Sequence, residues 1–141
     1  MRVLVTRPLE DAQETAALLQ VRGHEALVAP LFTVKFHGGP RIDLTGVQAV
    51  LATSANGVQA ISRRTSRRDL PLFAVGPQTA QIARNEGFKL VRSADGDAAA
   101  LAQAIPAWAS AENGALLHAS GVGRKFQHHH FRRTQVAKWN S

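Results

Sequence analysis

The sequence predicts an α/β protein built on parallel sheets. Short apolar segments typical of buried strands alternate with segments whose apolar residues recur at helical spacing, from the amino terminus to about residue 119. Two of the strand segments run directly into residues that start helices, at positions 53–57 and 76–79. Because such alternation is typical of crossover units, whose strands pair in parallel, we expect the strand ends to share one edge of a sheet.

The first crossover unit opens the chain. Residues 2–6 form a strand rich in Val and Leu, residues 10–22 place Ala and Leu at helical spacing, and residues 26–29 form a second strand. Gly23 ends the helix, and Pro30 closes the second strand. We expect the two strands to pair in parallel through a right-handed crossover.

Residues 31–40 depart from this rhythm. Apolar side chains at positions 32, 34 and 36 alternate with Thr33 and Lys35, and Gly38-Gly39-Pro40 then breaks the chain. The pattern is typical of an exposed two-faced ribbon, and we interpret residues 31–40 as a connector between domains. An edge strand of the first sheet is the alternative interpretation.

The alternation resumes beyond this connector. The predicted strands are 49–52, 70–75, 89–91 and 115–119, and the helices between them are 58–64, 77–86 and 97–104. Gly87 is placed to form a left-handed C-cap and Asp97 to form an N-cap.

The predicted organisation is therefore two parallel-sheet α/β domains joined by the ribbon. Residues 1–30 are the amino-terminal part of domain 1, 31–40 the connector, 41–121 domain 2, and 122–141 a divergent basic tail. A first domain of residues 1–30 alone has one crossover unit and too little core to be stable.

Composition narrows the class of protein. Of the 141 residues, 45% are apolar and 19% charged, as in globular chains. There is no cysteine, which excludes disulfides, thiolate metal sites and a cysteine nucleophile. No apolar run approaches the roughly 20 residues that span a bilayer, and the amino terminus lacks the apolar core of a signal peptide. We expect a cytoplasmic protein without membrane contact.

The net charge of +7 is concentrated in the tail. All 10 acidic residues precede position 122, whereas five of the 17 basic residues follow it. Five cations without an interleaved base-stacking order are poor support for nucleic-acid binding. Consecutive histidines at 128–130 lack the spacing of a folded metal site, so no metal is expected.

The first candidate site lies at the end of the strand 49–52. Thr53, Ser54, Asn56 and Gly57 combine hydroxyls, an amide and a glycine where the first N–H groups of a helix have no internal partner. A carboxylate or phosphate fits such a junction. The alternative is that Ser54 or Asn56 only caps the helix.

The second candidate site follows the strand 70–75. Gly76 permits close backbone approach, Pro77 suits a first helical turn, and Thr79 lies in that turn. If the two strands are parallel neighbours, both junctions lie at the carboxyl edge of one sheet, where open α/β sheets bind ligands.

A run of arginines and hydroxyl residues at 63–68 also fits phosphate. A solvated helix end is the alternative, because cations complement the dipole there. Neither a dinucleotide fingerprint, a P-loop, a serine elbow nor an acidic phospho-acceptor at a strand end is present in the sequence.

Five motifs in order resemble the uroporphyrinogen-III synthase family, covering residues 1 to about 121. They are Val3-Leu4-Val5-Thr6-Arg7-Pro8, Ala29-Pro30-Leu31, Thr53-Ser54-Ala55-Asn56-Gly57-Val58, Phe73-Ala74-Val75-Gly76-Pro77 with Thr79-Ala80, and Glu86-Gly87-Phe88.

The resemblance implies a cofactor-independent lyase of tetrapyrrole biosynthesis. Family members cyclise hydroxymethylbilane, a polycarboxylate, with inversion of the last pyrrole ring and release of water, in a cleft between two α/β domains joined by a two-stranded ribbon. The resemblance also implies that domain 1 is incomplete in this chain, because family members complete it with a long carboxyl-terminal segment. Matched positions imply that substrate is bound by Thr6 and Arg7 of domain 1, and by Thr53, Ser54, Asn56, Gly57, Gly76 and Thr79 of domain 2. No catalytic residue is assigned, and Arg7 has the alternative of an ordinary surface cation.

The sequence departs from the family near Val122, where members continue with further helices and strands. We expect a truncation or shifted reading frame there, weak activity, and self-association through incomplete sheet edges. The alternative function is a non-catalytic α/β binding module whose basic tail contacts nucleic acid or an acidic partner.

Overall fold

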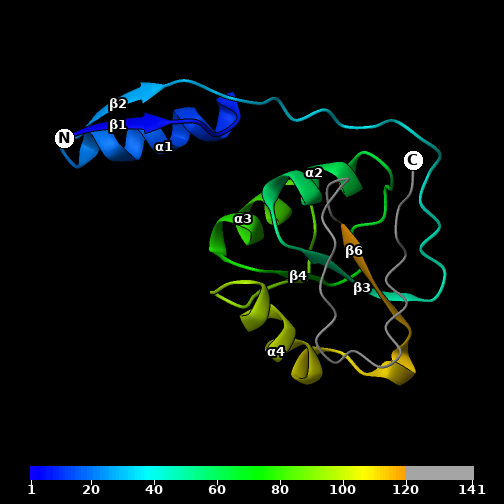
Figure 1. The fold of residues 1–141 in the computed structure, drawn as a ribbon. Coiled ribbons are helices and arrows are strands. Elements are labelled where there is room, and N and C mark those ends of the chain that lie inside the picture. Colours follow the sequence, from blue (N-terminus) through cyan, green and yellow to red (C-terminus); the bar gives the residue numbers. More distant parts are fainter. Residues whose placement is uncertain (120–141) are drawn as a thin grey trace. The chain divides into compact units, whose positions relative to one another are not determined.

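The computed structural model describes residues 1–119. The chain divides into two compact units, Met1–Phe36 and His37–Ser141, and each is described by itself (Figure 1). The division falls inside the predicted connector 31–40. The mixed α/β class and the parallel sheets are confirmed.

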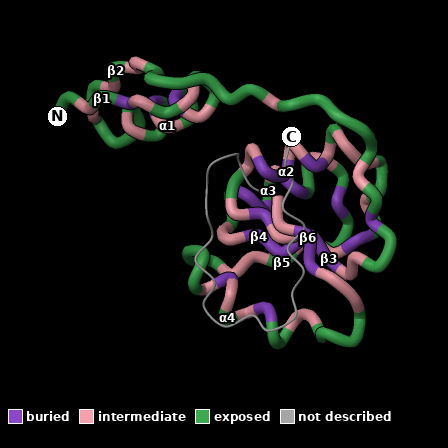
Figure 2. The backbone as a smooth tube through the Cα atoms, turned by 45° about the vertical axis from the view of Figure 1, so that its right-hand side comes forward, coloured by how far each residue is buried: buried purple, intermediate pink, exposed green. Residues whose placement is uncertain are grey.

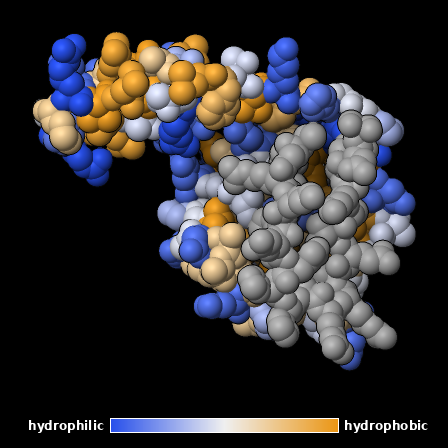
Figure 3. Space-filling model, viewed as in Figure 1, coloured by the Kyte–Doolittle hydropathy of each residue, from blue (hydrophilic) through white to orange (hydrophobic). Residues whose placement is uncertain are grey.

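The first unit is a single crossover. Strand β1 (Arg2–Val5) and strand β2 (Glu25–Val28) pair in parallel on either side of helix α1 (Leu9–Val21), as the sequence predicts. The helix packs on one face of the strand pair through Ala12 and Ala16, both buried. The other face carries Leu4 and Leu27, which stand opposite each other and are each 59% exposed. Figure 3 shows the apolar side chains gathered on this unit.

The connector carries no strand. Between β2 and Val47 the structure assigns no helix or strand, so the ribbon over residues 31–40 remains a prediction. Phe32 and Val34, two of the apolar residues that alternate with polar ones in this segment, are exposed. The domain bounds likewise remain predictions.

The second unit holds a four-stranded sheet in the order β5-β4-β3-β6, with all three pairings parallel. Along the chain its elements are β3 (Val47–Ala52), α2 (Ala55–Ser62), β4 (Leu72–Ala74), α3 (Pro77–Asn85), β5 (Val91–Ser93), α4 (Ala98–Trp108), a short 3-10 turn (Ala111–Asn113) and β6 (Ala115–Ala119). Parallel strands require helical crossovers, and helices cover both faces of this sheet.

Two core clusters lie on the two faces of this sheet (Figures 1 and 2). Helices α2 and α3 cover one face, where Val58 and Ala83 pack against Leu72. Helix α4 covers the other face, where Leu101 packs with Phe73. Strand β4 is buried along its whole length because it lies inside the sheet with both faces covered.

Several predicted bounds were wrong, including those of the strands placed at 49–52 and 70–75, which are Val47–Ala52 and Leu72–Ala74. The helix placed at 58–64 begins at Ala55, because Ser54 caps it earlier than the apolar spacing indicates. The strand placed at 89–91 is Val91–Ser93, because the chain first leaves α3 through Gly87 at a φ of +91° and buries Phe88.

The helix placed at 97–104 instead runs through Pro106 to Trp108. Pro106 lies on the exposed side, and the last turn is held by Trp108, whose ring packs 5.2 Å from that of Phe73. The predicted caps at Gly87 and Asp97 are confirmed, and the Asp97 carboxylate accepts from the amide of Ala100 at 2.9 Å.

Within residues 1–119, every helix is too short or too polar to cross a bilayer. Residues 120–141, and with them the whole of the predicted tail and its three histidines, lie outside the described part of the chain.

Candidate active site

The carboxyl edge of the second sheet brings the two predicted junctions together. Strands β3 and β4 are parallel neighbours with Ala52 opposite Ala74, and the amide of Val75 donates to the carbonyl of Ala52 at 3.1 Å. Adjacent strands lie about 4.8 Å apart, so the starts of α2 and α3 stand side by side at this edge. The sequence-based expectation of neighbouring junctions is confirmed.

Ser54 is the N-cap of α2. Its backbone is extended, with φ −159° and ψ 157°, and its Oγ accepts a hydrogen bond from the amide of Gly57 at 3.2 Å. The structure therefore shows the Ser54 side chain in the alternative role considered from the sequence, that of a helix cap. The cap satisfies one donor of the first turn. The amides of Ala55 and Asn56 have no preceding helical turn whose carbonyls could accept from them.

Gly57 is a glycine for a packing reason. A Cβ built at this position would lie 2.8 Å from the carbonyl oxygen of Ala119, at the end of β6. Asn56, in contrast, is partly buried, and no hydrogen bond of its side chain to another residue of 1–119 is present. Its amide group is therefore the more accessible donor of this pair.

The start of α3 is organised differently. Gly76 is the N-cap with extended backbone at φ −153°, and Pro77 occupies the first turn as predicted. A Cβ on Gly76 would meet only the carbonyl oxygen of Gly96, at 3.8 Å, so space alone does not require glycine. Thr79 is 6% exposed and is the one buried polar residue among those described.

His118 belongs to this edge, although sequence reasoning did not single it out. It lies one residue before the end of β6, which pairs with β3 on the side opposite β4. Its Nε2 lies 3.4 Å from Oγ1 of Thr53. Burial lowers the pKa of His118 below its ordinary value of 6.5, so the imidazole is neutral at pH 7.

Thr6 and Arg7 belong to the first unit. The guanidinium of Arg7 donates to Oγ1 of Thr15 at 3.1 Å and to the carboxylate of Asp11 at 3.2 Å. The carbonyl of Thr6 accepts from the amide of Leu31 at 3.3 Å. Arg7 is thus held on α1 by an ion pair that is partly exposed, with its own side chain 48% exposed.

The gathered residues of the second unit are hydroxyls, amides, backbone N–H groups and one neutral imidazole. Helix starts carry partial positive charge, so their donors stabilise an anionic oxygen without a full countercharge. This edge is suited to binding carboxylates and to orienting them. Among residues 1–119, this edge supplies no strong nucleophile.

Fold and edge together define a parallel-sheet α/β protein whose helix starts meet at one sheet edge, the usual ligand position of this class. The chain matches the family described as HEM4, uroporphyrinogen-III synthase HemD, over residues 13–133. It therefore belongs to the uroporphyrinogen-III synthase family, whose members are lyases of tetrapyrrole biosynthesis. The match starts inside α1 and continues past residue 121, the expected end of the resemblance. A comparison with curated proteins gave no match.

Proposed function

We propose that this chain binds hydroxymethylbilane and closes it to the type III macrocycle, with inversion of the last pyrrole ring and release of water. Family membership supports the reaction, and one geometric observation carries the site: the starts of α2 and α3 stand side by side where β3 and β4 end. We further propose that the reaction takes place in the cytoplasm and requires no cofactor.

The substrate's acetate and propionate groups would be bound at this edge. We propose that the first-turn amides of α2, the side chain of Asn56 and the backbone beside Gly76 donate to carboxylate oxygens. Hydroxyls of Thr53 and Thr79 supply further donors. Several neutral donors suit a substrate with many carboxylates, because different carboxylates can use the same donors. The electrostatic potential that these donors produce together at the edge is positive.

Thr6 and Arg7 are proposed as contacts of the first unit to the same substrate. Arg7 is already paired with Asp11, so it would contribute the guanidinium N–H donors that Asp11 and Thr15 leave unused rather than a full positive charge. Ser54 and Gly57 act as positioning residues in this proposal, since one caps α2 and the other seats it against β6.

Positioning would account for much of the rate. Closing a flexible linear tetrapyrrole requires its two ends to meet, and holding them together converts a rare encounter into an effectively unimolecular step. The C–O bond of the hydroxymethyl end breaks with its electron pair on oxygen, and the proton lost from the pyrrole N–H completes the released water. N–H donors already oriented at the edge would stabilise the negative charge that develops on the departing oxygen.

The full chain tests this proposal directly. It is incubated with hydroxymethylbilane, and after oxidation the type I and type III uroporphyrins are separated by chromatography. We expect type III product to form faster than spontaneous type I closure. Type I product alone, at the rate of buffer, would overturn the proposed reaction.

A pair of matched variants tests the site. Asn56→Ala removes the accessible amide and should lower kcat/KM roughly tenfold, the loss typical of one hydrogen bond to a charged group. Asn113→Ala removes an exposed amide from the 3-10 turn, outside the site, and should leave kcat/KM unchanged. Equal effects of the two substitutions would remove Asn56 from the site.

A further inference from the structure

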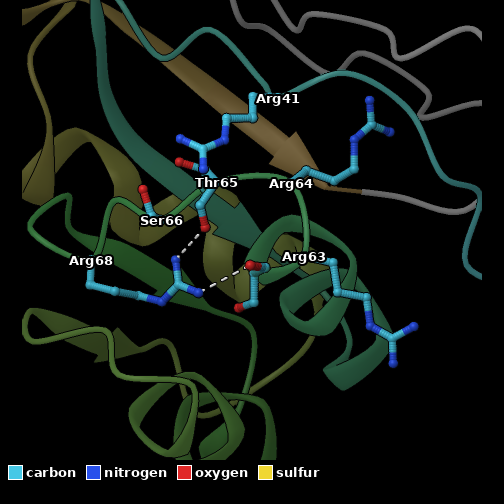
Figure 4. A pocket seen from close by; sticks show the side chains of 7 residues that line it. Arg41, Arg63, Arg64, Thr65, Ser66 and Arg68 are labelled. Atoms are coloured by element: carbon cyan, nitrogen blue, oxygen red, sulfur yellow. Dashed lines mark hydrogen bonds between the residues drawn. The ribbon is translucent and has the colours of Figure 1, made fainter.

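A second polar region lies at the other end of α2, at the amino edge of the same sheet. It is a hollow of about 290 Å³, lined by Arg41, Ser62, Arg63, Arg64, Thr65, Ser66 and Arg68 (Figure 4). Four of its seven lining residues are arginines and the other three carry hydroxyls. No carboxylate lines it.

Arg68 forms the floor of this hollow and organises the surrounding backbone. Its guanidinium donates to the carbonyl of Ser62, the last residue of α2, at 3.1 Å, and to the carbonyl of Thr65, just beyond the helix, at 2.7 Å. It also donates to the carbonyl of Glu86 at 2.7 Å and lies 5.0 Å from the ring centre of Phe88. The carbonyls that would repel an anion here are therefore already engaged by a cation.

Other donors around the hollow are unused by the described residues. The Oγ atom of Ser62 is buried and has no hydrogen-bond partner within residues 1–119. No hydrogen bond or ion pair within that range engages the side chains of Arg41 or Ser66 either. Figure 4 shows the guanidinium of Arg41 directed towards Thr65, on the side opposite Arg68.

The remaining arginines add charge without lining the centre. Arg64 donates through Nε and Nη2 to the carbonyl of Pro40, at 3.0 and 2.7 Å, which fixes the segment that carries Arg41. Figure 4 shows Arg63 and Arg64 extending away from the hollow. The nearby carboxylate of Asp69 is paired with Arg67 at 2.6 Å.

We propose that this hollow binds the diphosphate group of a small molecule. A buried hydroxyl without a partner, an unengaged guanidinium and a backbone already neutralised by Arg68 together supply donors that an oxyanion satisfies. Planar guanidinium groups suit phosphoryl oxygens in particular. At about 30 Å³ per water, the hollow has room for about ten waters, which favours two linked phosphoryl groups over one.

The sequence alone left the arginine run open between phosphate binding and a solvated helix end. The structure adds Arg41, which lies far from that run in sequence, and the orphaned hydroxyl of Ser62. The site is separate from the proposed substrate edge, because the two lie at opposite ends of α2, a helix about 12 Å long.

Calorimetric titration of the full chain with pyrophosphate, at constant ionic strength, tests the proposal. We expect saturable binding with one site per chain, and at least tenfold weaker affinity for Arg41→Gln. Arg84→Gln is the matched control, since it removes the same charge from an exposed position on α3 outside the hollow. Its affinity should equal that of the original chain.

Ser62→Ala provides a second readout that a purely structural role would not reproduce. In the free protein it should raise Tm, because it removes a buried hydroxyl without a partner, while it weakens pyrophosphate binding. Titration with ADP distinguishes the source of the diphosphate: tighter binding than pyrophosphate assigns a nucleotide, and equal affinity assigns the diphosphate group alone.

Three outcomes would overturn the site. They are the absence of saturable pyrophosphate binding, equal affinity in the Arg41→Gln and Arg84→Gln variants, and Ser62→Ala affinity equal to that of the original chain. None of them depends on synthase activity, so failure here leaves the proposed reaction standing, and failure of the proposed reaction leaves this site standing.

Discussion

Replacing Gly57 by alanine tests whether this glycine is required by packing. The position is helical, and in an open helix Gly→Ala stabilises by about 1 kcal/mol through propensity. Here the new Cβ would lie 2.8 Å from the carbonyl oxygen of Ala119, a backbone atom that cannot rotate away. Overpacking of this kind destabilises by about 1–3 kcal/mol. The expected net effect is a loss of about 1 kcal/mol.

Thermal unfolding followed by circular dichroism measures this effect. For a unit of about 100 residues, a loss of about 1 kcal/mol lowers Tm by roughly 4–8 °C. Gly38→Ala is the matched control, because its Cβ would meet nothing within 4 Å and should leave Tm nearly unchanged. A rise in Tm for Gly57→Ala, as expected of an open helical position, would refute the packing argument.

The remaining predictions concern a cap, an arginine and a histidine. Ser54→Ala should lose about 1 kcal/mol of unfolding free energy in urea titration, because the Gly57 amide loses the capping hydroxyl and keeps only the Ser54 carbonyl as acceptor. Ser110→Ala, which removes the cap of the short 3-10 turn, is the comparison, and an equal or smaller loss for Ser54→Ala would contradict the assignment. Arg68→Met should lose about 2–3 kcal/mol of unfolding free energy in the same assay, because the carbonyls of Ser62, Thr65 and Glu86 lose their donor. Arg84→Met is the control and should change the unfolding free energy little. Comparable losses in the two variants would show that Arg68 acts only through its charge. Burial depresses the folded-state pKa of His118, so the unfolded chain takes up its proton first as pH falls; the contribution of His118 to stability is complete above about pH 6.5 and declines below it. His118→Gln should flatten the stability profile measured from pH 7.5 to 5, whereas an unchanged slope would show that other groups set it.

Much of the fold could be predicted because local signals and the crossover rule agree. Asp97 and Gly87 mark a helix start and end through their own backbone chemistry, and both were placed correctly. The end of α4 could not be predicted in this way, because it depends on a tertiary contact. Trp108 keeps α4 helical past Pro106 by packing against Phe73, a contact between residues far apart in sequence.

The site shows the same division. Thr53 and Gly76 were expected to lie together because parallel neighbouring strands end at one edge, and the pairing of β3 with β4 brings their junctions together. His118 was missed because its position depends on which strand pairs with the far side of β3, and 65 residues separate it from Thr53. A titratable residue one position before the end of a predicted strand was the available signal.

Helix α2 separates the two proposed binding regions in a way that experiments can exploit. Ser54 precedes its first turn at the carboxyl edge of the sheet, and Ser62 ends it at the amino edge. The Ser54 hydroxyl has a partner and its loss destabilises the chain, whereas the Ser62 hydroxyl has none within residues 1–119 and its loss stabilises it. If both sites exist, Ser54→Ala perturbs type III cyclisation and spares pyrophosphate binding, and Ser62→Ala does the reverse. Since the two substitutions change stability in opposite directions, a shared loss of both functions could not be attributed to unfolding and would mean that the two ends of α2 are coupled.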